Sequence, residues 1–322
     1  MTRTKTKTLF VHAGIFKTGS SYLQSAIRHN KAFLARQGVI YAEGDDRNVT
    51  GFHAISAGNV MWPFIAPDQF ERLCEPLLGH DGSVLLSSEQ IFEGLAIHNL
   101  FDRFFDLSQR NGFERIKFLF FVRNPIRQAA SRWAEALVRE GMTTDLEEWL
   151  PSAPDIPRLA ACLQELTARP LAEVSVINYS VRKHHLANDL LDWLELDSTE
   201  GFEDRSDERV NRTLTLAEQD LQLAVNRAAQ EGFSGLGKAL CQELPHLEGE
   251  LAFPSREAQQ SLWDRIGACV HAINTHLPPD QHVEFDLQPK THVTSDVSFS
   301  REQLGVIASV LGQQFKRRRK PE

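Results

Sequence analysis

The sequence predicts an α/β fold, in which a parallel β-sheet is flanked by helices and followed by a mostly helical C-terminal third. Up to about residue 200, short apolar runs alternate with segments whose apolar residues recur at helical spacing. Such β-α-β-α alternation implies a parallel sheet with helices on its faces. After Gly201 only helical patterns remain. We therefore expect two regions, an α/β core over 1–200 and a helical region over 201–322 packed on it.

Composition narrows the class of protein. The 322 residues are 42% hydrophobic and 24% charged, which is ordinary for a soluble globular chain. No apolar run approaches the ~20 residues that span a bilayer, and the run after the polar residues 1–8 is too short for a signal peptide. We therefore expect a cytoplasmic protein without a transmembrane segment. The four cysteines lie far apart with no Cys-x-x-Cys pair, which favours reduced thiols and no metal site.

Charge bears on partners. The net charge of −8 disfavours non-specific binding to nucleic acid, so we expect no nucleic-acid partner. The exception is the C-terminal tail, where residues 316–320 are all Lys or Arg. A solvated chain end is one interpretation of this run. The other is a tether to an acidic surface or anionic lipid, which would give peripheral membrane contact.

The first strand, over residues 8–12, leads into a loop with two glycines and a lysine, and a helix follows from Ser20 to about residue 36. This arrangement presents backbone N–H groups and the positive end of a helix dipole to an anion, and Lys17 adds a full charge. Only two residues separate Gly14 from Lys17, so the loop is not a Walker A motif. We interpret it as a P-loop-like phosphate-binding loop. A plain glycine turn with a surface lysine is the alternative.

The other elements follow in order along the chain. Further strands are predicted over 38–41, 82–89, 116–122 and 174–179. Helices are predicted over 67–78, 101–111, 158–167 and 186–196, and from residues 125, 215, 255 and 300. Residues 51–57 are a candidate helix start. They contain His53, a lone histidine among apolar neighbours that is open to a structural or a functional role.

The strand over 82–89 ends in two serines and the carboxylate of Glu89. Ligands of open parallel sheets bind beyond the carboxyl ends of the strands, so Glu89 would face the same crevice as Lys17. A second interpretation, compatible with the first, is a helix cap in which Ser87 or Ser88 caps and Glu89 occupies the first turn.

The most hydrophobic run, over 116–122, is typical of a central parallel strand that is covered on both faces. It ends at Arg123, and an arginine there is costly without an anionic partner. Ser131 lies about two turns into the following helix. Guanidinium and hydroxyl would jointly hold a second phosphate. The alternative is an internal ion pair for Arg123 and a serine without a role.

Three motifs have now been described: the loop that contains Lys17, the strand that ends in two serines and Glu89, and Arg123 followed by Ser131. Together they resemble the sulfotransferases that use 3′-phosphoadenosine 5′-phosphosulfate (PAPS), and the likeness is nearest to bacterial and carbohydrate-modifying members. It covers roughly residues 8–200. It implies that Lys17 contacts the sulfated 5′-phosphate and the bridging oxygen, and that Arg123 and Ser131 hold the 3′-phosphate. The 5′-phosphate would be bound by the loop residues Thr18, Gly19, Ser20 and Ser21. No metal ion is implied.

The resemblance implies transfer of a sulfuryl group to a hydroxyl or amine of an acceptor, which we expect to be a carbohydrate or glycolipid, with adenosine 3′,5′-bisphosphate as the product. Glu89 is the preferred general base because it would end a sheet strand. His53 has the more suitable unperturbed pKa, ~6.5, and His12 is a third choice.

The sequence departs from the family pattern in two places. Arg127 and Gln128 fill the stretch before Ser131 in a different order from some members. An Arg-Lys-Gly segment near the C-terminus is missing, which leaves Arg209 or Arg212 for that role. Two other functions stay open: a nucleotide-dependent, kinase-like P-loop enzyme, and a catalytically silent nucleotide-binding scaffold of the same fold.

Overall fold

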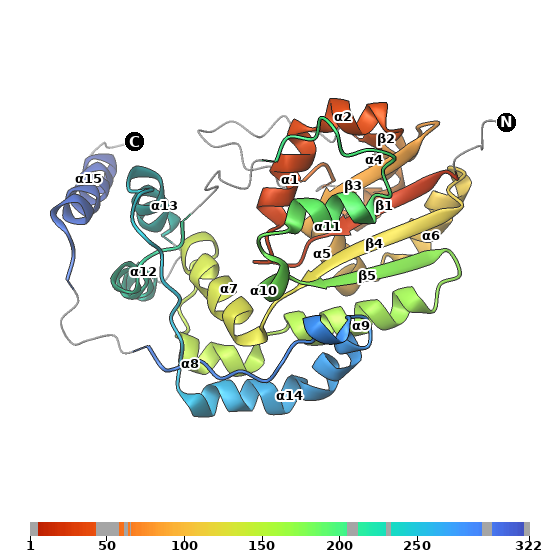
Figure 1. Cartoon of the computed structure of the whole chain (residues 1–322). Coiled ribbons are helices and arrows are strands. Elements are labelled where there is room, and N and C mark those ends of the chain that lie inside the picture. Colours follow the sequence, from red (N-terminus) through yellow and green to blue (C-terminus); the bar gives the residue numbers. More distant parts are fainter. Residues whose placement is uncertain are drawn as a thin grey trace. The chain divides into compact units, whose positions relative to one another are not determined.

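Five parallel strands form one sheet that helices flank, which confirms the predicted α/β class (Figure 1). The computed structural model describes residues 6–42, 58–60, 64, 66–204, 212–229, 233–291 and 298–318. Along the chain the strands are β1 (Thr8–Ala13), β2 (Val39–Tyr41), β3 (Ser83–Ser88), β4 (Arg115–Val122) and β5 (Ala172–Asn178). Their spatial order is β2-β3-β1-β4-β5.

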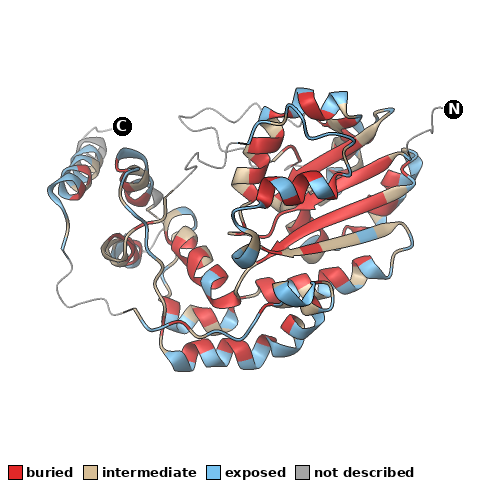
Figure 2. Cartoon of the chain, viewed as in Figure 1, coloured by how far each residue is buried: buried red, intermediate tan, exposed pale blue. Residues whose placement is uncertain are grey.

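Both faces of the sheet are covered, because successive side chains of a strand point to opposite faces. On β4, Leu119 and Phe121 join an apolar cluster with residues of α1 (Ser20–His29), α2 (Lys31–Arg36) and α11 (Leu186–Trp193). Phe118 and Phe120 instead contact phenylalanine rings of α5 (Glu89–His98) and α6 (Phe101–Arg110). Beside these helices pack α4 (Phe70–Leu78) and α9 (Asp155–Thr167). Strands β1, β3 and β4 are consequently almost wholly buried (Figure 2).

The chain divides into two compact units, each built from three stretches. The first, here called the sheet unit, comprises Met1–Asn124, Pro154–Val210 and Ile266–Glu284. The second, the helical unit, comprises Pro125–Ala153, Asn211–Arg265 and Phe285–Glu322. These units do not coincide with the predicted regions 1–200 and 201–322, and the packing of the C-terminal region on the core stays a prediction.

The remaining helices are mostly short or lie in the helical unit. The sheet unit also holds η2 (Pro67–Gln69), α10 (Tyr179–Arg182) and η4 (Pro279–Gln281). The helical unit holds α7 (Pro125–Arg139), α8 (Leu146–Trp149), η3 (Leu150–Ser152), α12 (Leu216–Ala229), α13 (Ser234–Glu243) and α15 (Arg301–Arg318), while α14 (Arg256–Asn274) belongs to both units. Within the part of the chain that the structure describes, no helix is both long and apolar enough to cross a bilayer.

Three helix predictions need correction. The helix predicted from Ser20 to residue 36 is two helices, because Asn30 interrupts it and its side-chain amide donates to Ala26 O at 2.9 Å. Glu89 opens α5 and does not end β3, so a helix stands where the sequence was interpreted as the end of a strand. Helix α13 was also not predicted. The candidate helix start over 51–57, with His53, lies outside the described residues.

Candidate functional site

The carboxyl ends of four strands meet at one edge of the sheet, here called the carboxyl edge. Ala13 of β1 is in register with Ser88 of β3, and Val122 of β4 with Asn178 of β5. The segments that follow these residues therefore leave the sheet at the same edge. Those segments carry Lys17, Glu89, Arg123 and Tyr179.

The strand order places a topological switch point between β1 and β4. After β1 the chain passes to β2 on one side of the sheet, whereas after β4 it passes to β5 on the other. Open α/β sheets bind ligands in the crevice that forms where the connections diverge in this way. The loop after β1 and Arg123 after β4 lie on the two sides of that point.

The loop after β1 is tightly turned. Lys17 has a φ of 66° and Gly19 a φ of 88°. For a residue other than glycine the left-handed conformation costs roughly 1–2 kcal/mol, and such strain clusters at ligand-binding sites. Gly19 is the N-cap of α1 and offers no side-chain cap, so the first N–H groups of the helix are left to other partners.

Two hydroxyl groups brace the loop from inside. Thr18 is fully buried and its Oγ1 donates to Ile15 O at 2.7 Å, while Ser20 Oγ donates to the same carbonyl at 3.3 Å. Ser21 is half-buried. The hydroxyl protons of Thr18 and Ser20 thus hold the loop, and the phosphate contact predicted for these residues stays a prediction.

Glu89 lies directly beside the start of the loop. The Gly14 N–H donates to Ser88 O at 3.2 Å, which ties the loop to the end of β3. A Cβ placed on Gly14 would come within 3.1 Å of Glu89 Cγ, so the missing side chain lets the two segments approach. Ser88 caps α5, since its Oγ accepts from the Gln90 N–H at 3.2 Å. The cap interpretation is therefore confirmed, and it also places the Glu89 side chain next to Gly14 of the loop.

Arg123 contacts the loop from the other side. Its Nη1 donates to Lys17 O at 3.2 Å, and its guanidinium carbon lies 5.5 Å from the centre of the Tyr179 ring. Tyr179 in turn packs against Gly19, where an added Cβ would be 2.9 Å from Tyr179 Cε2. Tyr179 opens α10 and does not end the strand as predicted. Sequence reasoning missed this ring, although an aromatic residue directly after a strand was a signal for it.

His12 lies in β1, entirely buried. Its Nδ1 is 2.8 Å from Ser87 Oγ, and its ring meets Phe121 edge-on. Burial lowers the pKa of the His12 imidazole to about 4, so the ring is neutral near pH 7. With no exposed surface, His12 does not reach an acceptor. Within the described part of the chain its Nε2 has no hydrogen-bond partner.

Asn59 fastens the end of β3 and was not predicted. Its Oδ1 accepts from Ser87 N–H at 2.8 Å, its own N–H donates to Ser87 O at 3.1 Å, and its Nδ2 donates to Ala42 O at 2.6 Å. Asn59 is 4% exposed. It therefore fixes the strand end from which Ser88 and Glu89 emerge.

Ser131 lies on α7 and is buried, but it belongs to the helical unit whereas Arg123 belongs to the sheet unit. Joint binding of one phosphate by Arg123 and Ser131 therefore stays a prediction. His53, Arg209 and the side chains of the basic run 316–320 lie outside the described residues.

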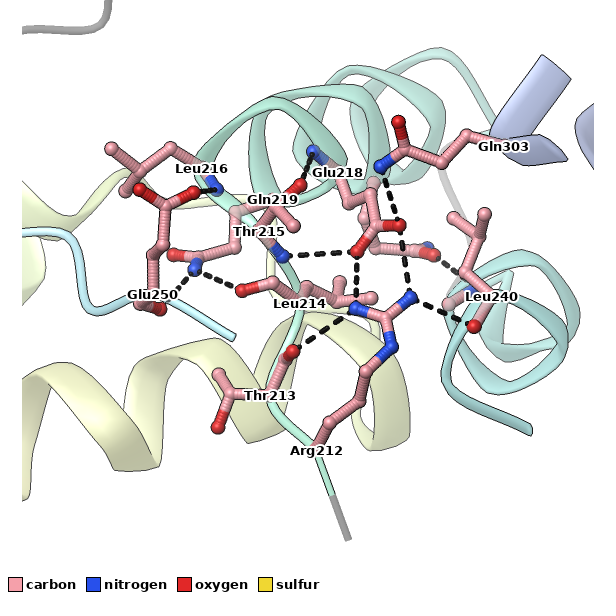
Figure 3. Close-up of polar contacts among 12 residues, drawn as sticks. Arg212, Thr213, Leu214, Thr215, Leu216, Glu218, Gln219, Leu240, Glu250 and Gln303 are labelled. Atoms are coloured by element: carbon pink, nitrogen blue, oxygen red, sulfur yellow. Dashed lines mark hydrogen bonds and ion pairs between the residues drawn. The ribbon is translucent and has the colours of Figure 1, made fainter. Parts of the chain in front are cut away.

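Arg212 is engaged elsewhere (Figure 3). Its guanidinium forms a buried ion pair with Glu218, with a distance of 2.7 Å between Nη1 and Oε2, and it also donates to Leu240 O and Thr213 O. Its side chain is 3% exposed. The contacts of Arg212 are thus internal to the helical unit, and Arg212 is no longer a candidate for binding the 3′-phosphate.

No protein-family model, curated protein or solved structure matches this chain.

Proposed function

We propose that the protein is a sulfotransferase that moves a sulfuryl group from PAPS to a hydroxyl or amine of an acceptor, and that the acceptor is a carbohydrate or glycolipid. The observation that carries this proposal is the contact of Arg123 Nη1 with Lys17 O, 3.2 Å apart. This contact joins Arg123, at the end of β4, to the loop after β1 at the switch point of the sheet. Two cationic side chains there suit a donor that carries phosphate groups at two positions.

The residues at the loop fit the sulfated end of PAPS. The N-terminus of α1 has no side-chain cap, and its amides with the helix dipole favour a bound anion. Lys17 is half-buried on the same loop. In the proposed reaction its ammonium group stabilises the negative charge that develops on the bridging oxygen of the donor, as preorganised cations do in transfer reactions.

Arg123 would bind the 3′-phosphate of the donor, with Ser131 as its proposed partner. The guanidinium presents a planar fork that matches a phosphate, and it lies over the ring of Tyr179, 5.5 Å from the ring centre.

Glu89 is the proposed general base, because its side-chain Cγ lies next to Gly14 at the loop. It would take the proton of the acceptor hydroxyl or amine, a contribution of about 10²–10⁴-fold in rate. PAPS supplies the sulfuryl group, and the proposal needs no metal ion. We also propose a cytoplasmic location.

A transfer assay tests the proposal. Labelled PAPS is incubated with panels of glycosides, glycolipids, amines and phenols, and labelled product is counted for the wild type, for Lys17→Ala and for Lys238→Ala. Lys238 is an exposed lysine of α13 and serves as the matched control. We expect Lys17→Ala to lower transfer by about 10²-fold or more, and Lys238→Ala to leave it unchanged.

The outcome separates the alternatives. Transfer that survives Lys17→Ala at the wild-type rate would contradict the role of the loop. Tight binding of adenosine 3′,5′-bisphosphate with no transfer to any acceptor would indicate a silent scaffold. Phosphoryl transfer from ATP in place of sulfuryl transfer would indicate the kinase-like enzyme.

A further inference from the structure

One face of α15 is used in packing within the helical unit. Val306 joins an apolar cluster with four leucines of the unit, namely Leu214, Leu236, Leu240 and Leu244. Gln303 is buried, and its Nε2 donates to Glu218 Oε1 at 2.9 Å. These contacts fix which side of the helix faces the rest of the unit.

A second apolar stripe of α15 is exposed. Leu304 and Leu311 are 51% and 47% exposed, and Ala308 between them is also exposed. Spacings of four and seven residues place these three side chains on one side of a helix. Two of the five large hydrophobic residues that are most exposed in the described chain therefore lie together on one helix.

Apart from Glu302, which lies 3.0 Å from His246 Nε2, the charged residues around this stripe are basic. Arg301 is exposed about one turn before Leu304, and the run 316–320 consists of five basic residues. The sequence has no acidic residue between Gln303 and Lys320, although the chain as a whole carries a net charge of −8. This local concentration of positive charge complements an acidic surface.

We propose that α15 and the basic run 316–320, which begins before the helix ends, dock the protein on an anionic lipid bilayer. An apolar stripe next to basic residues is the pattern of helices that lie in a membrane interface, with leucines in the acyl boundary and cations at the headgroups. Nucleic acid would satisfy the charges but would offer no apolar phase for Leu304 and Leu311. The proposal does not depend on the proposed transfer reaction.

Sedimentation with vesicles tests this docking surface. The full chain, without PAPS or acceptor, is mixed with vesicles of phosphatidylcholine alone or of phosphatidylcholine with phosphatidylglycerol, at low and high salt. Two variants remove one feature each, Leu304→Ser/Leu311→Ser and Arg317→Glu/Arg318→Glu/Arg319→Glu. Matched controls change exposed residues elsewhere, Ile97→Ser/Val181→Ser and Arg110→Glu/Lys183→Glu/Lys238→Glu.

We expect binding to the anionic vesicles only, weakened by salt. Each basic residue near such a surface contributes about fivefold in affinity, so the triple reversal should weaken binding by about 100-fold or more. The leucine variant should also bind less, whereas both controls should bind as the wild type does. Circular dichroism checks that each variant folds.

Three results would overturn the proposal. One is an absence of binding to anionic vesicles. Another is binding that the controls weaken as much as the α15 variants do. A third is binding that depends on the basic run but not on Leu304 and Leu311, especially if a single-stranded RNA competes for it, because a purely electrostatic surface would then explain the result.

Discussion

At the scale of single residues, the loop after β1 depends most visibly on Gly19. Its φ of 88° lies in the left-handed region, where glycine has no steric cost. The position of a Cβ on Gly19 would also be only 2.8 Å from Leu186 Cδ1 and 2.9 Å from Tyr179 Cε2. The residue is thus constrained by its backbone and by its neighbours at once.

We predict that Gly19→Ala lowers the free energy of unfolding by about 2–5 kcal/mol, from backbone strain and overpacking together. Gly112→Ala is the matched control. Gly112 has a φ of 77°, but a Cβ there would meet no atom within 4 Å. It should cost about 1–2 kcal/mol. Urea unfolding measures both variants, and equal losses would show that Tyr179 and Leu186 do not confine the loop.

His12 makes stability depend on pH. Burial lowers its pKa from 6.5 to about 4, so between these values the unfolded chain binds a proton that the folded chain does not. Stability should therefore fall as the pH decreases through this window, and the whole difference corresponds to about 3 kcal/mol.

His12→Gln tests this titration. We predict that the variant loses about 3 kcal/mol less than the wild type when the pH is lowered from about 7 to about 4, because only the histidine must become protonated on unfolding. Urea unfolding of both proteins across this range gives the difference. Parallel curves for the wild type and the variant would contradict the buried, neutral state of His12.

The sequence located the polar residues at strand ends because a charged side chain directly after an apolar run stands out. Glu89 and Arg123 were proposed in this way, whereas Lys17 was proposed from the glycine-containing loop after the first strand. Asn59 and Tyr179 were not, because their roles come from contacts with Ser87, Gly19 and Arg123 that are distant in sequence. The residues around a strand end do not show which distant residues it will contact.

At the scale of elements, the start of α12 combines a helix cap with an ion pair. Thr215 and Glu218 form a capping box: the Glu218 N–H donates to Thr215 Oγ1 at 3.3 Å, and the Thr215 N–H donates to Glu218 Oε2 at 2.9 Å. Burial raises the pKa of Glu218, but hydrogen bonds from Arg212, Gln303 and Thr215 outweigh it and lower the pKa overall. The Glu218 carboxylate thus takes part both in the helix cap and in the ion pair with Arg212.

We predict that Arg212→Met lowers the free energy of unfolding by about 3–5 kcal/mol, because it leaves a buried carboxylate without its partner. Adding Glu218→Gln should restore part of this loss, since the amide carries no charge. Arg227→Met is the control. Its ion pair with Asp145 has side chains 49% and 46% exposed, and its loss should cost at most about 1 kcal/mol.

Chemical denaturation measures the free energy of unfolding of these variants. A double variant that is less stable than Arg212→Met alone would contradict this prediction. It would show that Glu218 stabilises the unit through its hydrogen bonds, and that its unpaired charge is not the cause of the loss.

Helices and strands were predicted correctly where the apolar residues followed a single clear pattern. All five strands were expected from their apolar runs, and the structure places each within about two residues of its predicted bounds. Only the start of α5 was anticipated, through the helix cap at Ser88 and Glu89, because the helix follows β3 without a loop. Helix α13 was missed because its two glycines, Gly235 and Gly237, weaken the helical pattern.

At the scale of the whole molecule, the alternation of strands and helices determined the parallel sheet but not the order of its strands. That order creates the switch point between β1 and β4, and it depends on pairings between strands distant in sequence. The division into two units was also beyond prediction, because each unit joins three stretches of the chain. The site at the carboxyl edge follows from this topology more than from any single motif.

The most direct test of the central claim is calorimetric titration of the wild type and Arg123→Ala with adenosine 3′,5′-bisphosphate, and of the wild type with ATP and Mg²⁺. We predict that the bisphosphate binds the wild type more tightly than ATP does, because the loop lacks Walker A spacing and Arg123 is the residue proposed to bind a second phosphate. Arg123→Ala should weaken bisphosphate binding by about 2–5 kcal/mol. Tighter binding of ATP, or an unchanged affinity in Arg123→Ala, would contradict the assignment of the β1–α1 loop and Arg123 to a sulfuryl donor.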